Sequence, residues 1–289
     1  MQPTEEQERI VASDAGSLVV EAGAGAAKTT TLGLYASARP RSRILYLAFN
    51  KSIQLEAAAR MPPNVNCRTT HSIAWRKAAE LFGGEASQRV GKTYASSVAR
   101  TFRCGPLVAT AALQAIQNWC GSLSSQIDAS HVPTDIAERL ADPGSVVEIA
   151  RATWARMCRP DGGELRLPHD GYLKLFQMEE PTLRGQDLVA VDEAQDLNLC
   201  TYDIVRRQGG GLVLVGDSAQ QIFAFRGSAN ALGVHEADQR LQLTRSFRFG
   251  EGLAQMANAL LDHFKLDNTL HLVGAGRAAT RLSVDTRRA

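Results

Sequence analysis

Apolar runs alternate with amphipathic stretches in two separated regions of the chain. Five short apolar runs have the character of strands: SLVVEA at 17–22, RILYLAF at 43–49, VNCRT at 65–69, DLVAVDE at 187–193 and GLVLVGD at 211–217. Three stretches between them are predicted helices, which start at Lys28, at Ser52 and near 199. Buried strands separated by helices are typical of a parallel sheet covered on both faces. The two regions are therefore predicted to form one α/β sheet.

The pattern changes between residues 81 and 182, where strand-like runs are few. Apolar residues recur there at helical spacing in LVATAALQAIQNW at 107–119 and SVVEIARATWARM at 145–157. PTDIAERL at 133–140 offers Thr134 as a helix cap. Trp119 and Trp154 are expected in the core of this region rather than in a ligand site. We therefore predict a mainly α-helical domain, residues 81–182, inserted into a sheet domain formed by residues 1–80 and 183–246.

Composition narrows the function classes. The 289 residues are 44% hydrophobic and 21% charged, which are values typical of a folded globular protein. A formal charge of +2 is too small for nucleic acid to be bound by bulk charge, so such binding would need a local groove. The five scattered cysteines include no CxxC pair and favour reduced thiols over a metal site. No apolar run approaches the roughly 18 residues of a membrane span, and a cytoplasmic location without membrane contact is expected.

A strand, a turn of small residues and a helix follow one another in EAGAGAAKTTTL at 21–32. This order places backbone N–H groups and a helix N-terminus around an anion. In phosphate-binding loops the lysine, here Lys28, reaches the outer phosphates of ATP, and the next hydroxyl, here Thr29, binds Mg²⁺. The pattern GxxxxGK[ST] has Ala22 at its first glycine and Ala27 at its second. Taken alone, the stretch fits a glycine-rich turn equally well.

Two adjacent carboxylates, Asp192 and Glu193, follow the apolar strand in VAVDEAQD. Open α/β sheets bind their ligands at the carboxyl ends of their strands. Transfer of a phosphoryl group from ATP to water needs one carboxylate for Mg²⁺ and a group that orients the water. An acidic surface turn would predict neither the preceding strand nor the GD pair at 216–217. The pair therefore favours a nucleotide site.

Further motifs occur in a fixed order along the chain. They are DEAQD at 192–196, VGDSAQQIFAFRGSANAL at 215–232, LTRSFRFG at 243–250, AFNKSI at 48–53, CRTTHSIA at 67–74 and HDGYLKLFQ at 169–177. In these motifs the chain resembles the UvrD/Rep group of superfamily 1 DNA helicases, and the resemblance covers nearly the whole chain. Within that group it is most similar to the helicase part of the F-box DNA helicases, although no F-box segment is present. The resemblance implies a RecA-like P-loop domain that uses ATP and Mg²⁺ to move 3′ to 5′ along single-stranded DNA or at DNA junctions, as in DNA repair.

The resemblance also implies roles for individual residues. The loop that holds the phosphates is Ala22, Gly23, Ala24, Gly25, Ala26, Ala27, Lys28, Thr29 and Thr30. Gln7 would read the adenine edge and Phe247 would stack on that base. The catalytic groups would be the water-activating Glu193, Lys28, and the γ-phosphate sensors Gln220 and Arg248. Mg²⁺ would be held by Thr29 and Asp192. The DNA contacts would be Phe49, Asn50, Thr70, His71, the stacking Phe225 and its neighbour Arg226.

Two of these assignments have a structural alternative. Aromatic side chains stack on any base for about 1 to 3 kcal/mol each, which gives grip without sequence choice. Phe223 and Phe225 would point the same way on an extended segment, so either could belong to the core instead. From the sequence alone, His71 could equally be a structural histidine or a DNA contact.

The chain departs from the family pattern at Ala27. If this position needs φ > 0, alanine there costs roughly 1 to 2 kcal/mol, and its methyl group crowds the phosphate. ATP binding would then weaken by about tenfold. The site is expected to be impaired and still competent, with a non-hydrolysing DNA-binding or regulatory module as the alternative.

The second departure lies at 247–289, which is predicted to begin a truncated second RecA-like domain. An arginine supplied across the cleft between two such domains is worth roughly 10³ to 10⁵ in rate. The chain alone is therefore not expected to unwind DNA efficiently. It would be a fragment of a longer helicase, a remnant, or a partner of a second RecA-like domain or chain. A P-loop kinase for a small molecule fits poorly, because DEAQD and the aromatic run have no place in it.

Overall fold

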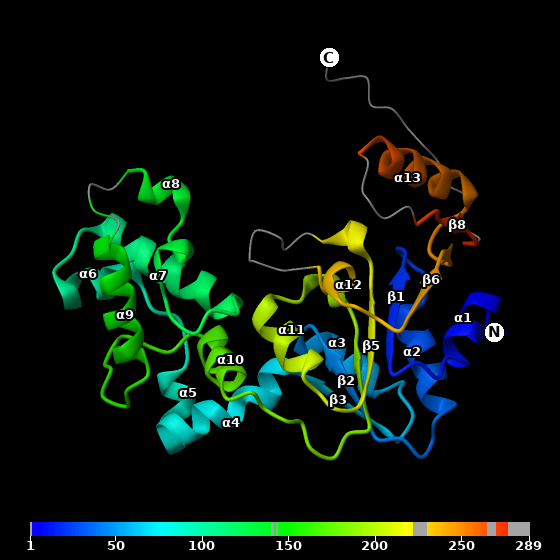
Figure 1. Cartoon of the computed structure of the whole chain (residues 1–289), viewed down its shortest axis with the longest axis horizontal. Coiled ribbons are helices and arrows are strands. Elements are labelled where there is room, and N and C mark those ends of the chain that lie inside the picture. Colours follow the sequence, from blue (N-terminus) through cyan, green and yellow to red (C-terminus); the bar gives the residue numbers. More distant parts are fainter. Residues whose placement is uncertain (1, 140–141, 143, 222–229, 265–269, 277–289) are drawn as a thin grey trace.

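The computed structural model describes residues 2–139, 142, 144–221, 230–264 and 270–276. Its centre is a six-stranded sheet in the order β3-β2-β4-β5-β1-β6, in which every neighbouring pair is parallel (Figure 1). The strands are β1 (Ser17–Ala22), β2 (Ile44–Ala48), β3 (Val65–Thr69), β4 (Leu188–Val191), β5 (Gly211–Gly216) and β6 (Gln239–Leu243). The prediction of an α/β fold with one parallel sheet from two chain regions is confirmed.

Successive residues of the strands enter two different cores. Leu18 and Val20 of β1 pack on one face with the helices α1 (Glu5–Val11), α2 (Lys28–Ser37) and α3 (Lys51–Ala58). Val19 packs on the other face with α11 (Leu199–Arg206) and α12 (Ala231–Val234). Burial on both faces is the reason these strands read as continuous apolar runs rather than as an alternation.

Within the six-stranded sheet, β6 is the strand that the hydrophobic pattern did not predict. Its sequence, QRLQL, leaves the first, second and fourth residues exposed. It is held as an edge strand by pairing from Leu18↔Gln239 to Ala22↔Leu243. Backbone pairing does not depend on side-chain hydropathy, so a polar edge strand gives little signal.

A second group of helices packs beside the sheet, at the left of Figure 1. Its members are α4 (Thr70–Phe82), α5 (Ala86–Arg89), α6 (Ala95–Phe102), α7 (Pro106–Gly121), α8 (Thr134–Ala137), α9 (Gly144–Met157) and α10 (His169–Met178). Trp119 is buried in their core and meets Trp154 edge to face, with ring centroids 4.8 Å apart. The same core includes Ala74 of α4 and Ile204 of α11, so it continues into the sheet region. The predicted boundaries at 81 and 182 stay a prediction.

The expected cap of α8 was wrong. The helix begins at Thr134, Pro133 occupies the cap position, and no side chain among the described residues caps the helix end. Proline is accepted there because its fixed φ suits the start of a helix and its missing N–H would have had no helical partner.

The last described residues form a small unit above the sheet, at the upper right of Figure 1. Its elements are β7 (Arg245–Ser246), α13 (Glu251–His263) and β8 (Val273–Gly274), with β7 and β8 paired in parallel. Whether residues 247–289 begin a second RecA-like domain stays a prediction. None of the helices within the described ranges combines the length and the apolar character that crossing a bilayer requires.

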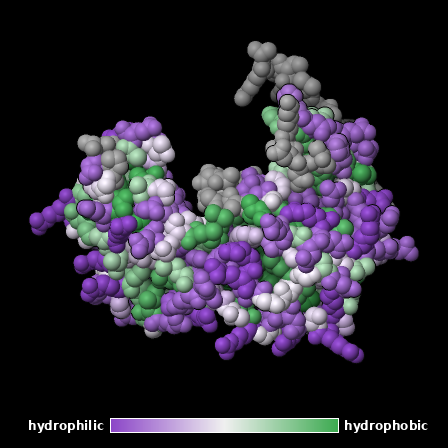
Figure 2. Space-filling model, viewed as in Figure 1, coloured by the Kyte–Doolittle hydropathy of each residue, from purple (hydrophilic) through white to green (hydrophobic). Residues whose placement is uncertain are grey.

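Figure 2 shows the surface hollowed between the helical group and the sheet region, with apolar side chains gathered at the bottom of the hollow. In a parallel sheet all carboxyl ends lie at one edge. The segments that follow β1, β2, β3, β4 and β5 therefore meet on the same side of the sheet, and they contain most of the residues predicted to bind nucleotide and DNA. Gln7 lies before β1, and Phe247 and Arg248 lie after β7.

Candidate nucleotide-binding site

The loop between β1 and α2 has the backbone shape of an anion cradle. Gly25 has φ 75° and Ala27 has φ 58° and ψ 41°, so both lie in the left-handed region. No side chain in the described part of the chain caps α2, so the first N–H groups of this ten-residue helix are left for an anion. The condition set for Ala27, a positive φ, is met. The strain belongs to the conformation of the loop itself, so we expect it to lower folding stability.

The loop and the acidic pair meet in space. Thr29 Oγ1 donates to Asp192 Oδ2 at 2.9 Å. Lys28 Nζ lies 3.2 Å from Glu193 Oε2. Asp192 is 4% exposed, and the N–H of Glu193 donates to its Oδ1 at 3.0 Å. The first two residues of α2 thus contact the two residues that follow β4, although the pairs are more than 160 positions apart in the sequence.

Tyr46 is a site residue that the sequence analysis missed. It lies on β2, is 1% exposed, and its hydroxyl donates to Asp192 Oδ2 at 2.6 Å. Burial and the neighbouring Asp192 raise the pKa of Tyr46, so the phenol keeps its proton and acts as a donor. A tyrosine in an apolar strand was the available signal, because a buried phenol needs a partner.

Burial controls the charge of the acidic groups. Desolvation raises the pKa of Asp192, and the hydrogen bonds from Tyr46 and Thr29 oppose that rise. Desolvation and the charge of Glu193 raise the pKa of Asp196 to about 6. Lys28 pairs directly with Glu193, and its charge also acts to lower the pKa of Asp192. A bound cation would add positive charge beside both carboxylates.

The donor set fits Mg²⁺. Magnesium in nucleotide sites is held by one or two protein oxygens together with substrate phosphates and waters. Thr29 gives its proton to Asp192, so the lone pairs of the hydroxyl remain for a cation. Within the described residues no three His, Cys, Asp or Glu side chains form a metal cluster, so such a cation would depend on nucleotide phosphates.

Side-chain hydrogen bonds connect the acidic pair to the segment after β5. Gln195 Nε2 donates to Glu193 Oε2 at 2.9 Å, and Gln195 Oε1 accepts from the N–H of Asp217 at 3.0 Å. Gln220, a predicted γ-phosphate sensor, donates through Nε2 to Asp217 Oδ2. Gln220 is therefore connected to Glu193 through two intervening residues, Asp217 and Gln195. The sequence contained no signal for Gln195 as the link.

Gln7 lies beside the loop, and its side-chain amide already makes two hydrogen bonds within the protein. Its Oε1 accepts from the N–H of Thr4 at 3.0 Å, as part of the capping box of α1. Its Nε2 donates to Thr31 Oγ1 at 3.0 Å, and Thr31 Oγ1 donates to the carbonyl of Ala27 at 3.0 Å. One N–H and one lone pair of the amide remain for an adenine edge. Thr31 was not foreseen.

The other predicted nucleotide residues also lie at the loop. The N–H of Phe247 donates to the carbonyl of Gly25 at 3.0 Å, and the ring is half-buried. A Cβ at Gly25 would come within 2.6 Å of Arg248 Cβ, and one at Gly23 within 2.1 Å of Leu272 Cδ2. Residues 246–248 and 272 thus lie directly against the loop, and side chains at these two glycines would collide with them.

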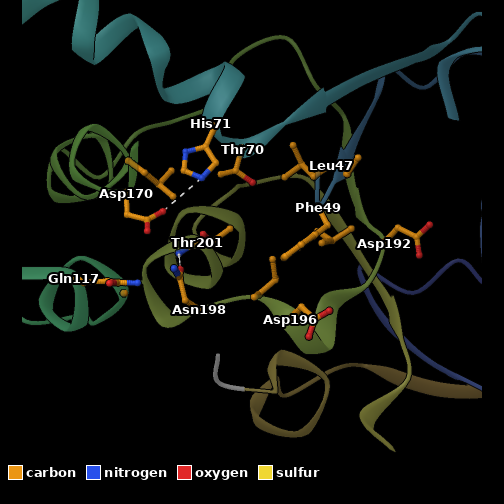
Figure 3. A pocket seen from close by; sticks show the side chains of 15 residues that line it. Leu47, Phe49, Thr70, His71, Gln117, Asp170, Asp192, Asp196, Asn198 and Thr201 are labelled. Atoms are coloured by element: carbon orange, nitrogen blue, oxygen red, sulfur yellow. Dashed lines mark hydrogen bonds and ion pairs between the residues drawn. The ribbon is translucent and has the colours of Figure 1, made fainter. Parts of the chain in front are cut away.

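A cavity of about 190 Å³ joins the predicted DNA contacts to this site (Figure 3). Phe49, Thr70, His71, Asp192 and Asp196 are among the residues that line it. Figure 3 shows Thr70 and His71 together on one helix, with Phe49 between them and the two aspartates.

The predicted DNA residues differ in their surroundings. His71 Nε2 lies 3.5 Å from Asp170 Oδ1, a contact that the sequence did not reveal. Asn50 is exposed and caps α3 by accepting from the N–H of Ile53 at 2.9 Å. Phe225 and Arg226, together with Phe223, lie outside the described residues.

The chain is similar to known proteins over most of its length. Residues 7–226 match the family model described as an AAA domain. The chain is 34% identical over 297 aligned residues to F-box DNA helicase 1 of Gallus gallus, covering 95% of this chain and 29% of that protein. It is 30% identical over 269 residues to F-box DNA helicase protein 1 of Schizosaccharomyces pombe, covering 84% of this chain and 30% of that protein. The chain thus spans less than a third of the length of either relative.

Proposed function

Because the chain belongs to the AAA domain family and is a superfamily 1 helicase-like region with an ATP-binding domain, we propose that it is the ATP-binding part of an ATP-dependent DNA helicase of the UvrD/Rep type. In this proposal, ATP hydrolysis drives 3′ to 5′ movement along single-stranded DNA. The partners would be single-stranded DNA or DNA junctions and a second RecA-like domain or chain. DNA repair is the corresponding process.

The observation that carries the proposal is the paired contact of Lys28 with Glu193 and Thr29 with Asp192. These contacts bring the phosphate loop and the acidic pair to one place at the carboxyl edge of the sheet. Mg²⁺, when bound with ATP, would neutralise phosphate charge as the γ-phosphoryl group is transferred. Thr29 and Asp192 would hold the ion.

Lys28 would exchange partners when nucleotide binds. Its ammonium group now pairs with Glu193 at 3.2 Å. Phosphate oxygens carry more negative charge and would draw Lys28 toward them. Glu193 would then be released to accept a proton from the attacking water, while Gln195 keeps hold of its Oε2. In this proposal Glu193 and the phosphate compete for the same ammonium group.

The cavity offers a route from nucleotide to DNA. Asp196 lies on the same short turn, Ala194–Asp196, that follows Glu193, and it faces the space lined by Phe49 and His71. A shift of this turn during hydrolysis would change the shape of the surface proposed to hold the DNA strand. The proposed DNA contacts Asn50 and Thr70 lie at the ends of the neighbouring strands β2 and β3.

Binding of a fluorescent ATP analogue in the presence of Mg²⁺ tests the proposal. Saturable binding is expected, with Lys28→Ala weakening it by at least about tenfold, because a charge-assisted phosphate contact is lost. Lys92→Ala removes an exposed lysine of the helical group and is the matched control. Equal binding by the parent and Lys28→Ala would count against a phosphate site.

A second candidate, a non-hydrolysing DNA-binding or regulatory module, is favoured by the left-handed Ala27 in place of a glycine. It predicts single-strand binding that weakens with salt and does not respond to ATP. The two candidates separate in a hydrolysis assay with and without single-stranded DNA. DNA-stimulated phosphate release that disappears in Glu193→Gln supports the helicase. Single-strand binding that ATP does not change, in a chain that shows no saturable ATP binding, supports the module.

A further inference from the structure

Asp192 receives three hydrogen bonds, two of them from other elements of the fold. Tyr46 from β2 and Thr29 from α2 both donate to Oδ2, at 2.6 and 2.9 Å. The N–H of Glu193 donates to Oδ1 at 3.0 Å. The carboxylate is 4% exposed and lines the cavity, so little of it is accessible to water.

The number of lone pairs on the carboxylate decides what remains for a cation. A carboxylate has about four acceptor positions, two on each oxygen. The hydroxyls of Tyr46 and Thr29 use both positions on Oδ2, and the backbone uses one of the two on Oδ1. One acceptor position therefore remains, and it is on Oδ1. Without the Tyr46 hydroxyl, a position on each oxygen would be open.

We propose that Tyr46 is a positioning residue that limits Asp192 to a single outward acceptor position and thereby makes the site selective for Mg²⁺ over Ca²⁺. The inference rests on the proposed nucleotide function, since the cation would arrive with ATP. Nothing in the motif pattern assigns a role to Tyr46, which precedes the AFNKSI segment within β2.

The two cations differ in what they require of a carboxylate. Ca²⁺ takes six to eight oxygen ligands and accepts both oxygens of one carboxylate, in a flexible geometry. Mg²⁺ needs a near-ideal octahedron, keeps several waters and uses carboxylates sparingly. An aspartate held in one orientation with one free position suits the smaller ion. The buried ring of Tyr46 and the parallel pairing of β2 with β4, Tyr46↔Ala190, fix the direction from which its hydroxyl approaches.

The experiment compares Tyr46→Phe with the parent chain. The cation midpoints for binding of a fluorescent ATP analogue are measured in Mg²⁺ and in Ca²⁺, with a third series in EDTA. Bound Mn²⁺, counted by electron paramagnetic resonance, reports on the metal without any turnover. Tyr35→Phe is the matched control, because Tyr35 is equally buried in the same core and, in the described chain, its hydroxyl makes no hydrogen bond.

For Tyr46→Phe we expect the Mg²⁺ midpoint to rise by about tenfold, which is the low end for loss of a partner that orients a metal ligand. The Ca²⁺ midpoint should change less, so that the preference for Mg²⁺ narrows, while binding in EDTA and the Tyr35→Phe values stay at those of the parent. In an Asp192→Asn background the Tyr46→Phe change should have no further effect on either midpoint.

Equal shifts for both cations, or an equal loss in EDTA, would make Tyr46 a structural residue and overturn the inference. The parent alone also tests it, whether or not Tyr46→Phe folds, because a parent that binds nucleotide equally well with Ca²⁺ and Mg²⁺ contradicts the lone-pair argument. A parent that binds no nucleotide under any condition overturns the proposed function itself, and this inference with it.

Discussion

Replacing Ala27 by glycine should stabilise the protein. Ala27 has φ 58° and ψ 41°. This conformation costs a residue with a Cβ roughly 1 to 2 kcal/mol and costs glycine almost nothing. Glycine also makes the unfolded chain more flexible, which offsets about 0.4 to 1 kcal/mol of that gain. The free energy of unfolding should therefore rise by about 0.5 to 1 kcal/mol, which corresponds to roughly 1 to 4 °C in Tm.

The assay is denaturant and thermal unfolding of Ala27→Gly beside Ala24→Gly. Ala24 lies in the same loop and is half-buried like Ala27, but its φ is not positive. Ala24→Gly should lower the free energy of unfolding by about 0.4 to 1 kcal/mol, because only the entropy cost applies. Two alanine-to-glycine changes three residues apart are thus expected to have opposite signs.

A decrease of stability in both variants would refute the left-handed conformation of Ala27. ATP binding by Ala27→Gly measures a separate quantity. A gain in affinity together with the expected gain in stability would report the crowding of phosphate by the methyl group. An affinity gain without a stability gain would mean that the loop takes up its strain on binding.

Two further changes test the surroundings of the site. Asp196 has a folded pKa of about 6, above its ordinary value of 3.8, so the folded chain holds this proton more tightly than the unfolded one and stability falls as pH rises from about 4 to 6. Asp196→Asn should remove this loss, so at pH 7 its free energy of unfolding should exceed that of the parent by on the order of 1 kcal/mol. This is less than the full pKa shift implies, because the carboxyl group is partly exposed. A difference in the free energy of unfolding that does not change with pH would contradict the prediction. Thr31→Val should cost about 1 to 2 kcal/mol in denaturant unfolding, because it leaves the buried Nε2 of Gln7 without its acceptor. The exposed neighbour Thr30→Val should stay within about 0.5 kcal/mol, and equal effects of the two would argue against the Gln7 contact.

Much of the sheet could be predicted from local sequence. β1, β2, β3, β4 and β5 and the start of α2 lie within one residue of the expected ranges or inside them. A strand buried on both faces must be apolar throughout, so its pattern records its surroundings directly. β6 was not predicted, because an edge strand is fixed by its backbone pairing to β1. The cap of α8 was predicted wrongly, because proline could occupy the cap position as well as threonine.

The sequence by itself indicated the α/β fold, the predicted phosphate loop and the acidic pair, because each strand, turn and motif leaves a local pattern in the chain. Only the tertiary structure decided that Tyr46 would hold Asp192, that Thr31 would tie Gln7 to the loop, and that Gln195 would link Glu193 to the segment after β5. These contacts join strands and helices whose order along the chain follows from the hydrophobic pattern. The pattern does not say which of them lie side by side. Their partners are chosen by strand order and register, which arise when the whole sheet packs, and a single polar side chain in an apolar run cannot encode them.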